Sequence, residues 1–224
     1  MAAQLALRGQ LLAAGARHLG WKCGFASAPA RKQLGTSAPL FGFLTDRGLL
    51  PSGSSIAIGD WARAVLEPEI AVHLGRDLAA GAGPEEIRAA IRALGPAIEV
   101  ADSDPAVTEV EAILSGDIFH RHVLLGSSDP SQAGLKTAEV SAIVTSDGVE
   151  VARSSYPAAL TGELVDTIAE LAAALEDCGQ RLRAGDIVIA GSLVRPIAVT
   201  AGTLYRAEIE PLGALEVRFQ EGAS

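Results

Sequence analysis

Residues 65–74 read VLEPEIAVHL, and this stretch says most about the fold. Polar and apolar residues alternate along it, which predicts a β-strand. Side chains two residues apart on a strand point to the same side, so the carboxylates of Glu67 and Glu69 are expected to face one side of the sheet. Pro68 lies between them and cannot donate a hydrogen bond to a neighbouring strand, which favours an edge strand or a strand end over a central strand.

The sequence on both sides of this strand also has recognisable patterns. Downstream, the tripeptide at 84–86 (PEE) predicts the start of a helix, since proline suits the first turn and acids favour the positive end of the helix dipole. The helix is expected to run to about Leu94, and a short strand to follow at 97–100. Upstream, residues 20–59 are rich in Gly, Pro and Ser, which predicts an ordered, loop-rich region.

The second half of the chain predicts several strands and one helix. Residues 140–145 and 149–153 flank the sequence SDG at 146–148, which is a good hairpin signal. Thr161 is expected to cap a helix that has a clear apolar stripe. The stripe consists of Leu164, Ile168, Leu171 and Leu175. Further strands are expected at 187–190, 197–200, 204–209 and 215–219.

These elements together predict the fold class and the domain organisation. Strands outnumber helices and several are joined by short turns, which indicates an α+β fold with a largely antiparallel or mixed sheet. No linker interrupts the pattern, so we expect one domain over residues 1–224. Residues 1–19 predict a short amphipathic helix, because Leu5, Leu12 and Leu19 recur on one face. Arg8 and Gln10 break the apolar run that a secretory signal requires.

Composition narrows the classes of function. The chain has 224 residues, of which 49% are apolar, and a net charge of -9. The negative charge argues against a nucleic-acid partner. No stretch reaches the roughly 20 apolar residues of a membrane span, so we expect a cytoplasmic protein without a membrane partner. Cys23 and Cys178 are too few for a disulfide framework, and each is expected to be a buried small hydrophobe.

A third acid, Glu99, adds to the two acids in residues 65–74. Glu99 lies inside the otherwise apolar strand predicted at 97–100, where an isolated buried carboxylate is costly. Together with Glu67 and Glu69 it forms the type of donor set that binds Mg²⁺ or Mn²⁺. The alternative is that all three are solvent-exposed glutamates at strand ends, and spacing alone favours this alternative.

Four motifs occur in a fixed order along the chain: GWKCG at 20–24, EPEIA at 67–71, IEVADS at 98–103 and GDIVIAGSL at 185–193. They resemble the 2-oxopent-4-enoate hydratases and 4-oxalocrotonate decarboxylases, within the fumarylacetoacetate hydrolase superfamily. The resemblance implies a mixed β-roll with a few flanking helices, homo-oligomers and a substrate that is a small 2-oxo or 2-hydroxydienoic acid. It also implies that Glu67, Glu69 and Glu99 hold a Mg²⁺ or Mn²⁺ ion.

The resemblance further indicates candidate catalytic and substrate-binding residues. Lys22 matches the lysine of the first motif and is expected to act in the chemistry and not in folding, with a solvated lysine on a loop as the alternative. Asp46 matches a position where the family often has an acid, although a turn-forming role beside Arg47 is the alternative. Gly191, Ser192 and Leu193 follow a predicted strand, where a hydroxyl and free backbone amides would hold a carboxylate. A plain turn is the alternative there.

One segment departs from the family pattern. Where hydratases commonly have Asp-Asn-Ala-Ser, residues 116–122 read GDIFHRH. Histidine transfers protons near neutral pH, and His120 and His122 would share a face if the segment were extended. His120 is therefore a candidate catalytic residue, with a surface or hydrogen-bonded histidine as the alternative.

The sequence favours a metal-dependent lyase, most closely a 2-oxopent-4-enoate-type hydratase. The same metal chemistry would also serve a 2-oxo acid decarboxylase or a hydrolase that cleaves an acylpyruvate. A catalytically silent partner subunit with the same fold is the alternative from another class.

Overall fold

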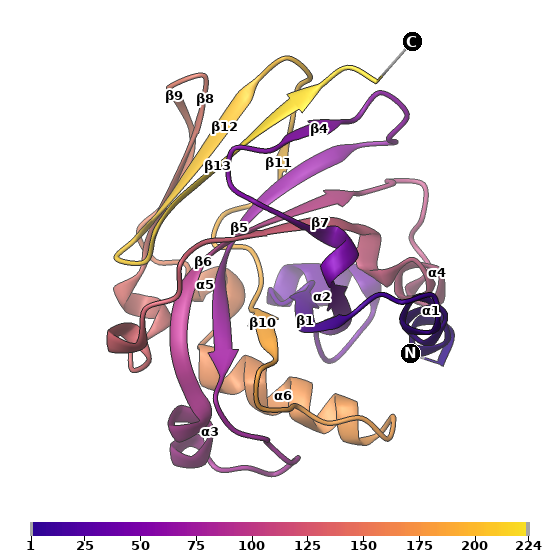
Figure 1. Ribbon diagram of the computed structural model, residues 1–224, viewed down its shortest axis with the longest axis vertical. Coiled ribbons are helices and arrows are strands. Elements are labelled where there is room, and N and C mark those ends of the chain that lie inside the picture. Colours follow the sequence, from indigo (N-terminus) through magenta and orange to yellow (C-terminus); the bar gives the residue numbers. More distant parts are fainter. Residues whose placement is uncertain (1, 223–224) are drawn as a thin grey trace.

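Residues 2–222, which this computed structural model describes, contain two β-sheets (Figure 1). The larger sheet has the strand order β2-β1-β10-β5-β6-β7-β3, and β11 pairs with β5 beyond the end of β10. Its strands are β1 (His18–Gly24), β2 (Leu40–Thr45), β3 (Leu49–Leu50), β5 (Ala64–Leu74), β6 (Ile91–Asp102), β7 (His120–Leu125), β10 (Ile187–Ile189) and β11 (Ile197–Ala198).

The smaller sheet has the order β4-β13-β12-β8-β9. Its strands are β4 (Ser55–Ala57), β8 (Ser141–Ser146), β9 (Val149–Ser154), β12 (Leu204–Glu210) and β13 (Gly213–Gln220). The hairpin predicted around the sequence SDG is confirmed by the antiparallel pairing of β8 with β9. Parallel and antiparallel pairs occur in both sheets, which confirms the α+β class with mixed sheets.

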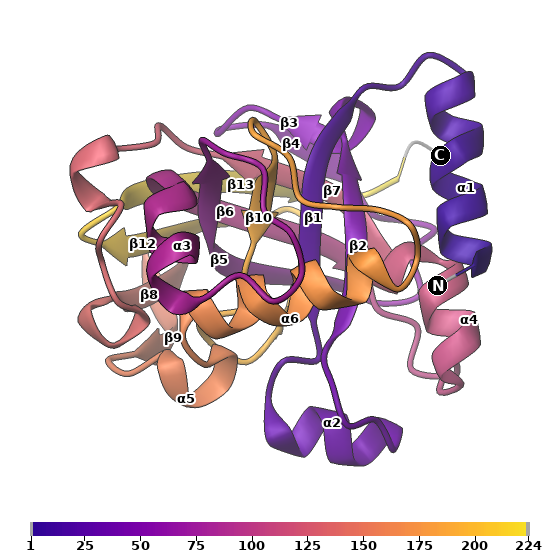
Figure 2. The same cartoon turned by 90° about the horizontal axis from the view of Figure 1, so that it is seen from below.

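Helices cover the larger sheet and its ends. They are α1 (Ala2–Ala13), α2 (Ala28–Leu34), α3 (Pro84–Ala90), α4 (Val110–Ser115), α5 (Ala158–Thr161) and α6 (Leu164–Glu176), with short 3₁₀ turns η1 (Asp46–Gly48), η2 (Asp117–Phe119), η3 (Pro130–Gln132) and η4 (Thr137–Glu139). Figure 2 shows α6 and α3 along one side of the sheet, and α1 beside α4 at one end. No helix within residues 2–222 is long and apolar enough to cross a membrane.

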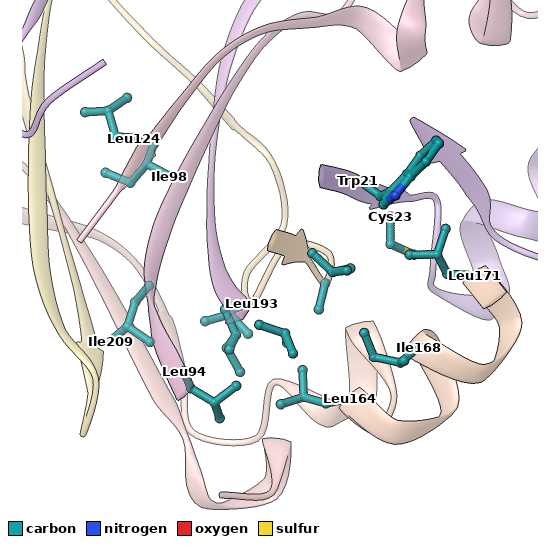
Figure 3. Close-up of a cluster of buried hydrophobic side chains, with 14 of the residues drawn as sticks. Trp21, Cys23, Leu94, Ile98, Leu124, Leu164, Ile168, Leu171, Leu193 and Ile209 are labelled. Carbon is teal, nitrogen blue, oxygen red and sulfur yellow. The ribbon is translucent and has the colours of Figure 1, made fainter. Parts of the chain in front are cut away.

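The main core extends from α6 across the larger sheet to the smaller sheet, where it includes Ala207, Ile209 and Val217. The predicted stripe Leu164, Ile168, Leu171 and Leu175 is confirmed, since each is at most 5% exposed. Figure 3 shows Leu171 and Ile168 facing Cys23 on β1. Burying such side chains contributes about 1.5–3 kcal/mol each, so this packing holds β1 firmly against α6. Cys23 is buried as expected, whereas Cys178 is half-buried, and both thiols are free.

The strand that contains Pro68 is not at an edge, so that prediction is wrong. β5 pairs with β6 on one side and with β10 and β11 on the other. The proline fits because β10 pairs with residues 71–73 and β11 with residues 65–66, so neither strand pairs with position 68. The chain that connects β10 to β11 leaves the sheet at this point, and it becomes part of the site described below.

Several predicted boundaries are also wrong. The N-terminal helix ends at Ala13 and not near residue 19, because Gly15 adopts a left-handed φ of 87° and the chain turns there. The region 20–59 contains α2 and four strands instead of loops alone. Residues 91–94 belong to β6, because pairing with β5 overrides their helical pattern. Helix α6 is capped at Glu163, while Thr161 ends α5.

Candidate active site

The register of β5 and β6 brings three carboxylates together. Glu67 lies directly opposite Glu99, and Glu69 lies two residues further along β5. Glu69 and Glu99 are 0% and 2% exposed, and Glu67 is partly buried. Burial and the charge of Glu99 raise the pKa of Glu67 to about 7, and the same causes raise the pKa of Glu69 well above its usual range. Buried carboxylates in this arrangement are stable only with a shared proton or a cation.

Lys22 supplies one positive charge to this cluster. It lies on β1, between β2 and β10, and is 2% exposed, so it is not the loop residue that the sequence indicated. Its Nζ donates hydrogen bonds to Glu99 Oε1 and, at 3.1 Å, to the Ile118 carbonyl oxygen. Burial disfavours the charged form of Lys22, but the negative charges of Glu99 and Asp117 outweigh this effect and raise the pKa of Lys22. The ammonium is therefore held charged inside the protein.

His120 contacts the same carboxylate from the start of β7. Its Nδ1 lies 2.7 Å from Glu99 Oε1. Burial would raise the pKa of Glu99, but the Lys22 charge and the His120 hydrogen bond lower it to about 2. A carboxylate at this position accepts a hydrogen bond, so Nδ1 carries a proton and Nε2 is the ring nitrogen that Glu99 does not bind. Nε2 is buried and finds no hydrogen-bond partner among residues 2–222.

His122 does not join His120. A register shift in the pairing of β6 with β7 separates the two residues, and the His122 ring stacks on Trp61 at 6.1 Å between ring centroids. Burial lowers the pKa of His122. The expectation that both histidines share a face is therefore wrong, and only His120 reaches the carboxylates.

The segment that departs from the family pattern contains a buried acid whose role the sequence did not reveal. Asp117 is 5% exposed, and its Oδ1 accepts hydrogen bonds from the Phe43 amide and from Gln4 Nε2, both at 3.0 Å. Burial raises its pKa to about 6, although the Lys22 charge acts in the opposite direction. One signal was present, because Gln4 is a polar residue on the same helical face as Leu7 and Leu11.

Backbone strain marks the same segment. Asp117, Ile118 and Phe119 have φ values of 52°, 54° and 64°, all in the left-handed region. Such conformations cost on the order of 1–3 kcal/mol per non-glycine residue and persist only where the surroundings impose them. The consequence is local: the turn directs the Ile118 carbonyl at Lys22 and starts β7 with His120 beside Glu99.

Residues 191–193 lie at the gap between β10 and β11. Gly191, at φ 100°, donates its amide to Glu69 Oε2 at 2.7 Å, and the Leu193 amide donates to the Pro68 carbonyl at 2.8 Å. Neither amide is free for a ligand, which corrects that part of the prediction. Ser192 Oγ is buried and has no partner within the described chain, so its hydroxyl stays available.

Asp46 is not brought to this cluster. Its carboxylate forms an ion pair with Arg17, with Oδ2 2.7 Å from Nε and Oδ1 accepting from the Arg17 amide at 2.8 Å. It follows Thr45, which pairs with His18, whereas Lys22 pairs with Gly42. Four residues along a strand correspond to about 13 Å, and the turn-forming alternative therefore describes Asp46 better.

The donor chemistry of the cluster fits a divalent cation, although its side chains are not arranged around one. Within residues 2–222, no three Asp, Glu, His or Cys side chains converge as a metal site. Glu99 bonds Lys22 and His120 through Oε1. Glu69 Oε1 is buried without a partner in the described structure. Three acidic side chains and one unsatisfied carboxylate oxygen match the hard oxygen ligands that Mg²⁺ and Mn²⁺ prefer.

The structure combines mixed sheets with a buried cluster of acids, Lys22 and His120, which is typical of an enzyme. The cluster lies on strands β1, β5, β6 and β7. The family model for the fumarylacetoacetate (FAA) hydrolase C-terminal region matches residues 13–220. The chain belongs to this family.

Curated relatives and solved structures agree with that assignment. A 4-oxalocrotonate decarboxylase from Pseudomonas sp. is 30% identical, over 90% of this chain and 78% of its own. A 2-keto-4-pentenoate hydratase from Dechloromonas aromatica is 32% identical, over 93% and 80%. The structure of 4-oxalocrotonate decarboxylase from Pseudomonas putida G7 with magnesium and adipate superposes with a TM-score of 0.89 at 23% identity, covering 96% of this chain and 83% of that one. This last likeness shows the shared fold.

Proposed function

We propose that this protein is a divalent-metal-dependent lyase that acts on a small 2-oxo acid, as a hydratase of the 2-oxopent-4-enoate type. The observation that carries the proposal is the buried ion pair of Lys22 and Glu99, set beside Glu67, Glu69 and His120. The names of the curated relatives support it, since most are 2-keto-4-pentenoate hydratases or related hydratases.

Glu67, Glu69 and Glu99 would hold the ion, and Mg²⁺ or Mn²⁺ suits their oxygens best. Solved relatives are described in complex with magnesium, calcium or manganese. When bound, the ion supplies a Lewis acid for the adjacent carboxylate and 2-oxo oxygens of the substrate.

The residues of the chain supply proton transfer and orientation. In hydration, a 2-hydroxydienoate loses its hydroxyl proton and gains a proton at C5, and water then adds hydroxide at C4 and a proton at C3. His120 Nε2 accepts a proton from the attacking water, because its Nδ1–H is held by Glu99. The Lys22 ammonium stabilises the negative charge that develops on the substrate oxygens, and the Ser192 hydroxyl binds the substrate carboxylate.

Two other outcomes use the same residues. Loss of CO₂ from a 2-oxo acid is supported by the 30% identity to a decarboxylase. Attack of water on a carbonyl carbon, as in hydrolysis of an acylpyruvate, would use the same free Nε2 of His120.

We also propose that the chain forms homo-oligomers, which light scattering would test.

Product analysis tests the reaction. The protein, loaded with Mg²⁺ or Mn²⁺, is incubated with a panel of short 2-oxo enoates, 2-oxo diacids and acylpyruvates in ¹⁸O-water, and the products are identified by mass spectrometry. We expect a 4-hydroxy-2-oxo acid with one ¹⁸O at C4. Release of CO₂ would instead assign a decarboxylase, and two acids a hydrolase. No turnover of any compound with either metal would favour a silent subunit.

A further inference from the structure

A buried contact links the N-terminal helix to the candidate site. Gln4 on α1 is 1% exposed, and its Nε2 donates to Asp117 Oδ1 at 3.0 Å across 113 residues of sequence. The same oxygen accepts from the Phe43 amide of β2 at 3.0 Å. Burying an amide side chain is costly without such a partner, so this contact fixes the position of Gln4 against Asp117.

Asp117 begins the strained turn that places two groups of the site. The turn directs the Ile118 carbonyl to Lys22 Nζ at 3.1 Å, and His120 follows it directly with Nδ1 2.7 Å from Glu99. An isoleucine with φ 54° is a conformational outlier that must be held by its surroundings. Figure 2 shows α1 packed beside α4, the helix that leads into this turn.

The atoms around the turn are tightly packed. A Cβ atom added at Gly42 would lie 2.7 Å from Lys22 Cγ and 2.8 Å from Asp117 Oδ1. The stem of Lys22, the backbone of β2 and the Asp117 carboxylate are therefore packed in direct contact. A shift of Asp117 must displace Lys22 or the turn, because the glycine leaves no spare room for either.

We propose that Gln4 and Asp117 are positioning residues, through which helix α1 holds the left-handed turn that aligns Lys22 and His120 with Glu99. The kinetic test of this inference rests on the proposed function, whereas its hydrogen-exchange test does not. Neither residue touches the reacting atoms. Their effect is to keep the Ile118 carbonyl and the His120 ring in place.

The first experiment compares two changes on the same helix. Gln4→Met removes the hydrogen bond to Asp117 at similar side-chain length, and Leu11→Ala removes core packing from α1 without touching the turn. We expect Gln4→Met to lower kcat about 10-fold or more while KM changes less than about twofold, since small misplacements of catalytic groups act on turnover. Leu11→Ala is expected to lower the melting temperature and to leave kcat unchanged. Equal kcat in Gln4→Met and the wild type would overturn the proposal.

The second experiment is independent of any reaction. The Phe119 amide donates to the Gly116 carbonyl at 3.1 Å and reports on the turn by hydrogen exchange. Its exchange is expected to accelerate in Gln4→Met and not in Leu11→Ala. An unchanged rate in Gln4→Met would contradict the proposal even if the wild type proved inactive, whereas an inactive wild type with accelerated exchange in the variant would refute only the proposed reaction.

A conservative change separates geometry from charge. Asp117→Asn keeps an oxygen that accepts from Phe43 and Gln4, and asparagine tolerates the left-handed region. Its kcat is expected to fall clearly less than that of Asp117→Ala, which is expected to behave like Gln4→Met or worse. Equal losses in both Asp117 variants would show that the charge of Asp117 acts directly, and would overturn the positioning role.

Discussion

Removing the Lys22 side chain should destabilise the protein, and the structure gives the size of the effect. Lys22 and Glu99 are both at most 2% exposed and form an ion pair. In Lys22→Met the Glu99 carboxylate loses its main counter-charge while it stays buried. The fall in the Glu99 pKa from 4.5 to about 2 is the net effect of Lys22 and His120 against burial. At about 1.4 kcal/mol for each pKa unit it corresponds to about 3 kcal/mol, the same order as the loss of about 3–5 kcal/mol typical when one partner of a buried ion pair is removed.

Unfolding by urea, on protein treated with a chelator, measures this quantity. We expect Lys22→Met to lose about 3 kcal/mol at pH 7.5, which for a chain of this size lowers the melting temperature by roughly 6–12 °C. The buried ion pair therefore predicts that Lys22 contributes to stability as well as to chemistry, which differs from the expectation from the sequence. The double variant Lys22→Met/Glu99→Gln removes both charges, and it should recover most of the loss.

The pH dependence gives an additional check. A carboxylate with a lowered pKa contributes stability above its unfolded value of about 4.3, and that contribution disappears as the pH falls through about 2. In Lys22→Met the buried Glu99 takes up a proton at higher pH than in the wild type, so the stability difference should shrink between pH 7.5 and pH 4.5. Exposed Arg153 pairs with Glu150, and Arg153→Met is the control that should unfold like the wild type. A Lys22→Met variant as stable as the wild type at pH 7.5 would show that the ion pair of Lys22 and Glu99 does not stabilise the fold.

Three further predictions concern individual side chains. Glu67→Gln, Glu69→Gln and Glu99→Gln should each weaken the binding of Mg²⁺ or Mn²⁺ about 10-fold or more, measured by calorimetry. The control Asp46→Asn should bind the metal as the wild type does. Unchanged affinity in one of the three glutamine variants would show that the replaced glutamate is not a metal ligand. His120→Ala should lower turnover by about 100-fold or more yet preserve metal-dependent exchange of the C3 protons of a bound 2-oxo acid, and loss of that exchange as well would assign His120 to the earlier proton transfer. Burial and the charge of Glu69 raise the pKa of the Cys23 thiol, so Cys178 alone should react rapidly with a thiol reagent in the folded protein, and Cys178→Ser should abolish the rapid phase.

Local patterns predicted those parts of the fold that depend on neighbours in sequence. The alternation in β5, the stripe on α6 and the β8–β9 hairpin all follow from spacing over a few residues. The strand β1 was missed because one of its partners, β10, lies far along the chain, and β2 in turn pairs with β1. The position of Pro68 was misjudged for a related reason, since the interruption between β10 and β11 is a property of the whole sheet.

The candidate site shows the same division. Glu67, Glu69 and Glu99 were singled out by their strand positions and assigned as metal ligands through the family resemblance, and Lys22 and His120 were chosen from their motif and residue type. Their contacts could not be predicted, because Lys22 meets Glu99 across 77 residues and Gln4 meets Asp117 across 113. The left-handed turn was also hidden, since no glycine within it signals positive φ angles.

Diffraction from crystals soaked with Mn²⁺ and pyruvate tests most directly whether Glu67, Glu69 and Glu99 hold the ion, because the anomalous signal locates the ion independently of the protein atoms. We expect one strong peak within coordination distance of oxygens of Glu67, Glu69 and Glu99, with the carboxylate and 2-oxo oxygens of pyruvate completing the coordination and Lys22 and His120 beside them. A peak bound by other residues, or no peak at saturating Mn²⁺ with Glu99 bonded only to Lys22 and His120, would contradict this ligand set.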